Sequence, residues 1–133
     1  MSTTRFVMVG ALAGLVMTMT TGWLITGVLC HRFQKATPST WRPEGWQQHA
    51  LAMLWSGIGG AALGGFDAQV PWSHSSAISA LAFAALLWGA MAGPVIATLA
   101  TYVNLHVVVV AGLLLEWLLF ALGVTLACWA WGT

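Results

Sequence analysis

Residues 106–131 read HVVVVAGLLLEWLLFALGVTLACWAW, an apolar run that carries a single charge, Glu116. A helix needs about 20 predominantly apolar residues to cross the hydrocarbon core of a bilayer, so this stretch is long enough to span it. The whole chain has the same character, because 59% of its 133 residues are hydrophobic and only 5% are charged. An average soluble domain is about 25% charged. The sequence therefore predicts an integral membrane protein.

Three more apolar stretches are long enough to span a bilayer, at about residues 6–30, 43–66 and 77–101, and we place the span around Glu116 at 105–131. Continuous apolar runs of this length differ from the alternating strands of about ten residues that build membrane barrels. We therefore predict an all-α membrane protein, a four-transmembrane-helix bundle with short loops and both termini on the same side. Residues 1–133 would form a single integral membrane domain.

The distribution of Lys and Arg indicates an orientation. Loop 31–45 holds Arg32, Lys35 and Arg42, whereas only Arg5 precedes the first span. Because cytoplasmic loops are enriched in Lys and Arg, we expect this loop in the cytoplasm and both termini outside. In size and hydropathy the chain resembles small four-span proteins of bacterial inner membranes. That resemblance implies a bacterial inner (plasma) membrane.

Small residues at a spacing of four recur in three of the predicted helices and favour close helix packing, either within the bundle or against other chains. A proline in the third predicted helix, Pro94, removes a backbone donor and predicts a kink. The glycines that form these pairs, or lie in line with them, are Gly10, Gly14, Gly57, Gly60, Gly64, Gly89 and Gly93.

Glu116 is the most informative residue, because a carboxyl group near the middle of a membrane helix is costly and normally faces the bundle interior. Helical spacing places Gly112, Phe120 and Gly123 on the same side of the helix as Glu116. Three roles are open: a proton or cation site, a protonated acid bonded to a backbone carbonyl or to Ser and Thr, and a contact to a partner chain.

The histidines suggest a weaker possibility. Alternating topology places His31, His49 and His106 on one side of the membrane. Imidazoles from different helices at one depth can hold a metal or clasp a haem iron, although no local spacing motif supports this. The alternative is that they cap helix ends or meet headgroups. Cys30 and Cys128 fall near opposite membrane faces, too far apart for a disulfide.

No catalytic motif is present, so we do not expect an enzyme, and the lack of a basic face argues against a nucleic-acid partner. Three functions remain, in order of preference. The first is a non-catalytic accessory or assembly subunit of a larger membrane complex. The second is a homo-oligomeric proton, cation or small-molecule transporter that uses Glu116. The third is a haem- or pigment-binding subunit of an electron-transfer or light-harvesting complex. The expected partners are membrane lipids and other membrane subunits or further copies of the chain.

Overall fold

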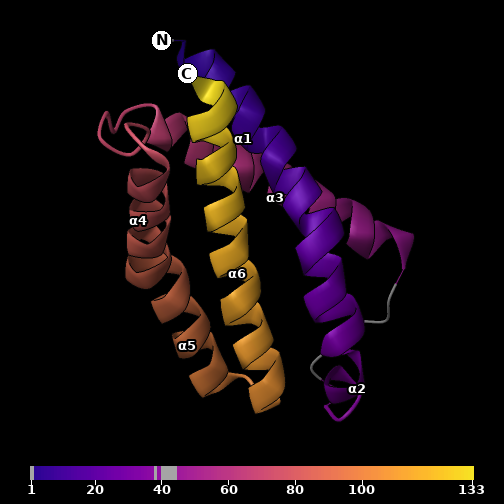
Figure 1. The fold of residues 1–133 in the computed structure, drawn as a ribbon. Coiled ribbons are helices and arrows are strands. Elements are labelled where there is room, and N and C mark those ends of the chain that lie inside the picture. Colours follow the sequence, from indigo (N-terminus) through magenta and orange to yellow (C-terminus); the bar gives the residue numbers. More distant parts are fainter. Residues whose placement is uncertain (1, 38, 40–44) are drawn as a thin grey trace.

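The structure is a computed structural model that describes residues 2–37, 39 and 45–133. Over these residues the chain forms helices joined by short turns, and Figure 1 shows how they are arranged. Three helices are built from consecutive α-helical and wider π-helical segments. In chain order the elements are α1 (Thr3–Met17), η1 (Thr18–Leu29), α2 (His31–Gln34), α3 (Trp46–Asp67), α4 (Ala77–Leu87), η2 (Trp88–Ala92), α5 (Gly93–Tyr102), α6 (Val107–Ala127) and η3 (Cys128–Gly132).

Three continuous helices are long and apolar enough to cross a membrane: Thr3–Leu29, Ala77–Tyr102 and Val107–Gly132. They confirm the all-helical class and fit a membrane protein, and they coincide with three of the four predicted spans. The remaining predicted span coincides with α3, a helix of 22 residues that does not reach the same apolar character. Its first turn carries Gln47, Gln48 and His49, which lowers its hydropathy. The predicted start of this span at Pro43 and the predicted loop residue Arg42 lie outside the described residues.

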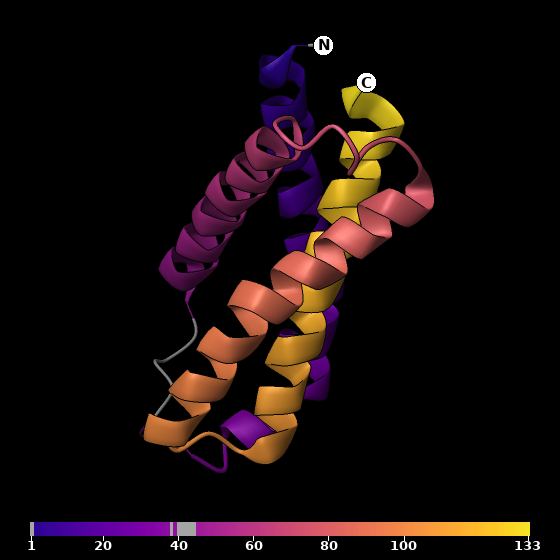
Figure 2. The ribbon, with the colours of Figure 1, turned by 90° about the vertical axis from the view of Figure 1, so that its left-hand side faces the viewer.

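Helix α6 lies at the centre of the molecule. The continuous helix α4–η2–α5 packs on one side of it and α1–η1 on the other, and Figure 2 shows α4–α5 running diagonally across α6. Part of the apolar core forms where α1 meets α6, from Phe6, Phe120, Val124 and Cys128. The N- and C-terminal ends lie together at one end of the bundle (Figure 1), where the Arg5 guanidinium donates to the Thr133 carbonyl oxygen at 3.3 Å.

Helix α3 crosses α1 obliquely, and glycines from both helices meet at the crossing. A Cβ atom added to Gly10 would collide with the Gly60 carbonyl oxygen, and one added to Gly60 would collide with the Gly10 carbonyl oxygen. A Cβ on Gly14 would lie 2.6 Å from the Ser56 carbonyl oxygen. The two backbones can approach this closely only because these positions lack side chains.

The helix Ala77–Tyr102 contains a wider turn, η2, directly before Pro94. The Gly93 N–H bonds to the Trp88 carbonyl oxygen five residues back, and α5 continues in a direction different from that of α4 (Figure 1). The Trp88 indole N–H donates to the Leu114 carbonyl oxygen of α6 at 2.9 Å. At Gly89, no described atom outside its own helix segment lies within 4 Å of an added Cβ.

Candidate functional site

The Glu116 carboxyl group projects from α6 onto η1, opposite a glycine. A Cβ atom added to Gly22 would lie 2.8 Å from Oε1 of Glu116. The absence of a side chain at Gly22 therefore makes room for the carboxyl group between the two helices. On either side of Glu116, Gly112 lies against Ile25 and Phe120 lies against Gly14. This is the face of α6 that helical spacing from Glu116 indicates.

A threonine of η1 holds the carboxyl group. The Thr26 side chain hydrogen-bonds to Glu116, and its hydroxyl also donates to the Gly22 carbonyl oxygen at 2.7 Å. Among the described residues the buried Oε2 of Glu116 has no hydrogen-bond partner. The Thr26 contact therefore falls to Oε1, the oxygen that faces Gly22.

The Thr26 hydroxyl lies within reach of two oxygens, the Gly22 carbonyl and the Glu116 carboxyl group. A threonine hydroxyl has one proton to donate and can also accept. It can therefore donate to an ionised Glu116, or accept from a protonated Glu116 while it donates to Gly22. A carboxyl group at this depth of a membrane helix is costly as an isolated charge.

A groove of about 420 Å³ runs between η1 and the first half of α3, with Glu116 in its wall. Most of its other lining groups are apolar, and Trp23 and Met19 are largely exposed, at 62% and 64%. The lining residues are Thr18, Met19, Gly22, Trp23, Thr26, Gly27, His49, Ala52, Met53 and Glu116.

A short chain of hydroxyl groups begins at Thr18, in the wall of the groove. The Thr18 hydroxyl donates to the Ser56 hydroxyl at 2.7 Å, and Ser56 donates to the Ala52 carbonyl oxygen at 2.7 Å. This chain ties η1 to α3 just beyond the glycine crossing. The groove lies between η1 and α3 on the side of this chain that faces loop 31–45.

The three histidines expected on one side of the membrane lie in different surroundings. His49 lines the groove beside Glu116. His106 caps α6 by accepting from the Val108 N–H at 3.2 Å, and its ring stacks on Phe33 at a centroid distance of 4.7 Å. His31 begins α2. Within the described residues no three His, Cys, Asp or Glu side chains form a metal-binding group. The haem or pigment site stays a prediction.

A second polar cluster caps the other end of the bundle. Asp67 and Ser73 are fully buried, and the Ser73 hydroxyl donates to the Asp67 carboxylate. Ser73 also lies 3.5 Å from Nδ1 of His74, whose ring packs on Phe6 at 5.1 Å. Burial raises the pKa of Asp67, while the Ser73 hydrogen bond and His74 oppose that shift. These contacts hold the α3–α4 connection against α1, which gives the cluster a structural role.

Cys30 and Cys128 are both free and buried, and no disulfide joins them.

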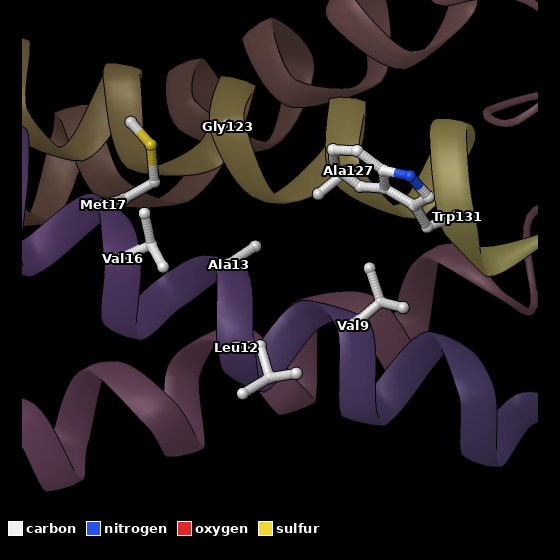
Figure 3. Close-up of a pocket in the computed structure, with 8 residues that line it drawn as sticks. All are labelled: Val9, Leu12, Ala13, Val16, Met17, Gly123, Ala127 and Trp131. Atoms are coloured by element: carbon white, nitrogen blue, oxygen red, sulfur yellow. The ribbon is translucent and has the colours of Figure 1, made fainter.

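An apolar groove of about 500 Å³ lies between α1 and α6, and Figure 3 shows side chains such as Val9, Ala13 and Trp131 between the two ribbons. It differs from the groove at Glu116 in having neither a charged nor a hydroxyl-bearing side chain in its wall. Its lining residues are Val9, Leu12, Ala13, Val16, Met17, Gly123, Ala127 and Trp131.

Sequence reasoning singled out Glu116 and His49 but missed Gly22, Thr26 and Thr18, which surround them. The missed signal is a spacing of four that continues beyond the glycine pair. Every fourth residue from position 10 to position 30 is small: Gly10, Gly14, Thr18, Gly22, Thr26 and Cys30.

Comparison with protein-family models, curated proteins and solved structures finds no match for this chain.

Proposed function

We propose that this membrane protein binds and releases a proton or cation at Glu116 and moves it across the bilayer as a homo-oligomer. The observation that carries the proposal is the geometry of the carboxyl group, which bonds to Thr26 through one oxygen and has the other unpartnered among the described residues. Ionisable residues inside membrane segments commonly mark proton and ion pathways. His49 lines the same groove.

Infrared difference spectroscopy tests the proton on Glu116 directly. Purified protein in lipid should show a carboxylic C=O band that shifts in D2O, disappears as the pH is raised and is absent from Glu116→Gln. A band that persists in Glu116→Gln would assign the protonated acid to another residue and contradict the proposal. Proton flux into liposomes should likewise fall to the background level in Glu116→Gln, and flux equal to wild type would exclude transport through Glu116.

A second candidate function is a non-catalytic accessory or assembly subunit of a larger membrane complex. The apolar groove in Figure 3 favours it, because Ala13, Gly123 and Ala127 offer the small side chains that let another membrane helix approach. Native mass spectrometry of protein extracted gently from its own membrane separates the two functions. A stoichiometric complex with another polypeptide would support the subunit role, and a homo-oligomer alone would support transport.

We also propose that α3 is a fourth membrane segment in a bacterial inner membrane, with loop 31–45 in the cytoplasm and both termini outside. Support comes from the outer face of α3, where large apolar side chains such as Leu54, Trp55 and Ile58 are about half exposed or more. An oblique crossing at glycines is a common way for membrane helices to pack. A membrane-impermeant maleimide should label Ala36→Cys in inverted vesicles, and labelling in intact cells instead would reverse this orientation.

A further inference from the structure

We infer that the groove at Glu116 is a binding site for a hydrophobic organic monocation, such as a quaternary or protonated amine, which exchanges with the proton of Glu116. This inference deepens the proposed function by naming the class of ligand. It rests on three features of the groove: the carboxyl group with its unpartnered oxygen, the aromatic and thioether wall, and the hydrogen bond that Thr26 can redirect.

The wall of the groove suits an organic cation better than a metal ion. A transition-metal ion is usually held by several His, Cys, Asp or Glu ligands, and no group of three of them exists among the described residues. The groove offers instead the indole of Trp23 and the thioethers of Met19 and Met53. Indole rings attract quaternary ammonium groups through their π faces, and methionine side chains adapt to apolar groups of varied shape.

The volume of the groove agrees with this class of ligand. About 420 Å³ lies within the range typical of small-molecule sites, which are mostly apolar with a few placed polar groups. Trp23 and Met19 are largely exposed on the side of η1, so a ligand can enter between η1 and α3. A partly membrane-soluble cation can reach such an opening from the bilayer.

The exchange balances in charge and hydrogen bonds. When the cation enters, the O–H bond of the Glu116 carboxyl group breaks, and the proton leaves to water. The carboxylate then neutralises the cation. The Thr26 hydroxyl turns its proton from the Gly22 carbonyl oxygen to the carboxylate, so the ionised acid keeps a hydrogen-bond donor. One cation bound therefore releases one proton.

Other groups that titrate near this site are few, and the experiment must separate them from Glu116. From α3, His49 lines the groove. From the end of η1, the Cys30 thiol lies within electrostatic reach of Glu116. The His49→Gln variant should keep the pH dependence of binding if Glu116 is its source.

The test uses benzyltrimethylammonium, a permanent cation that has no proton of its own, and its neutral isostere neopentylbenzene. Calorimetry with the full-length protein in detergent, repeated in buffers of different ionisation enthalpy, should show binding with release of about one proton. The apparent Kd should rise as the pH falls, by up to about tenfold per pH unit. Ligand-detected NMR should show that neopentylbenzene does not displace the cation.

Matched variants assign the binding to this groove. Glu116→Gln should weaken binding at least about tenfold, as expected for the loss of a buried charge partner. Trp23→Leu should weaken it about two- to fivefold through the lost cation–π contact. Trp55→Leu removes an equally exposed indole of α3 that does not line the groove, and it should bind like wild type. Size-exclusion profiles and thermal midpoints establish that each variant is folded.

Three results would overturn the inference: no binding of the cation to wild type, wild-type binding by Glu116→Gln, or equal losses in Trp23→Leu and Trp55→Leu. Each of these leaves the infrared band of Glu116 as an independent readout. If that band titrates while the cation does not bind, the organic cation is excluded as ligand and the proton site of the proposed function stands. If the band is absent as well, both fall.

Discussion

The two halves of the first helix use glycine in different ways. In α1, Gly10 and Gly14 bring the backbone of α3 against that of α1, and the contact is backbone on backbone. In η1, Gly22 makes room for a single carboxyl group that comes from α6. The first half is α-helical and closely packed against α3, whereas the second is π-helical and borders an open groove.

This difference teaches that small residues at a spacing of four mark a helix face without saying what occupies it. In α1, a Cβ added to Gly10 would meet the backbone of α3, which cannot move independently of its helix. In η1 the occupant is the end of a flexible side chain. An added methyl group should therefore lower the free energy of unfolding more at the glycine crossing than at Gly22. Three variants test this contrast.

The largest effect is expected at the crossing. Gly60→Ala places a Cβ against the Gly10 carbonyl oxygen, and neither backbone can yield without moving a helix. We expect a loss of about 2 kcal/mol or more in the free energy of unfolding, measured by denaturant titration in detergent. Gly89→Ala is the control, because its Cβ would meet no described atom within 4 Å and the change gains helix propensity. Similar unfolding midpoints for the two variants would contradict the close crossing.

A smaller effect is expected at Gly22→Ala. The new Cβ would meet Oε1 of Glu116, which can rotate away, so the free energy of unfolding should change by about 1 kcal/mol or less. The carboxyl group would then lose its position beside Thr26, and its infrared C=O band should move. An unchanged band together with a large loss of stability would show that Gly22 packs against backbone, as Gly10 does.

The smallest effect is expected at Thr26→Val, which keeps the side-chain shape and removes the hydroxyl. The loss of one hydrogen bond should cost about 1 kcal/mol and shift the C=O band of Glu116 toward that of a free acid. Thr101→Val is the matched control, because the Thr101 hydroxyl makes the same backbone contact, to the Ala97 carbonyl oxygen at 3.0 Å, on α5. Equal band positions in both variants would remove Thr26 from the site.

Much of the architecture was predictable because apolar length is a strong signal. The helices Thr3–Leu29, Ala77–Tyr102 and Val107–Gly132 begin within about three residues of the predicted spans. The prediction was less complete for α3, where glycines and the polar turn at Gln47 and Gln48 lower the hydropathy while helical length is kept. A criterion of apolar length alone cannot decide between a membrane segment and an oblique helix packed through glycines.

The candidate site was predictable only at its most unusual residue. Glu116 was recognisable because a carboxyl group in an apolar run is rare. Its neighbours Gly22 and Thr26 are marked in the sequence only by the small-residue spacing of four, which does not say which side chain that face meets. They also lie in a segment whose π-helical winding a helical period of 3.6 does not anticipate. Thr20 and Thr21 donate to carbonyl oxygens four residues back, contacts that distort α-helical hydrogen bonding, and they lie near the start of that winding.

The winding of η1 also sets the rotational phase of the first helix. In an α-helix each residue turns about 100°, so a four-residue step overshoots a full turn and a stripe at every fourth position drifts around the helix. A π-helical turn takes more than four residues, so the same step falls short. An α-helical half followed by a π-helical half cancels the drift, which keeps Gly10, Gly14, Gly22 and Thr26 close to one line. Deleting a single residue between Thr18 and Gly22 would therefore rotate the Thr26 hydroxyl away from Glu116 while leaving the glycine crossing in place.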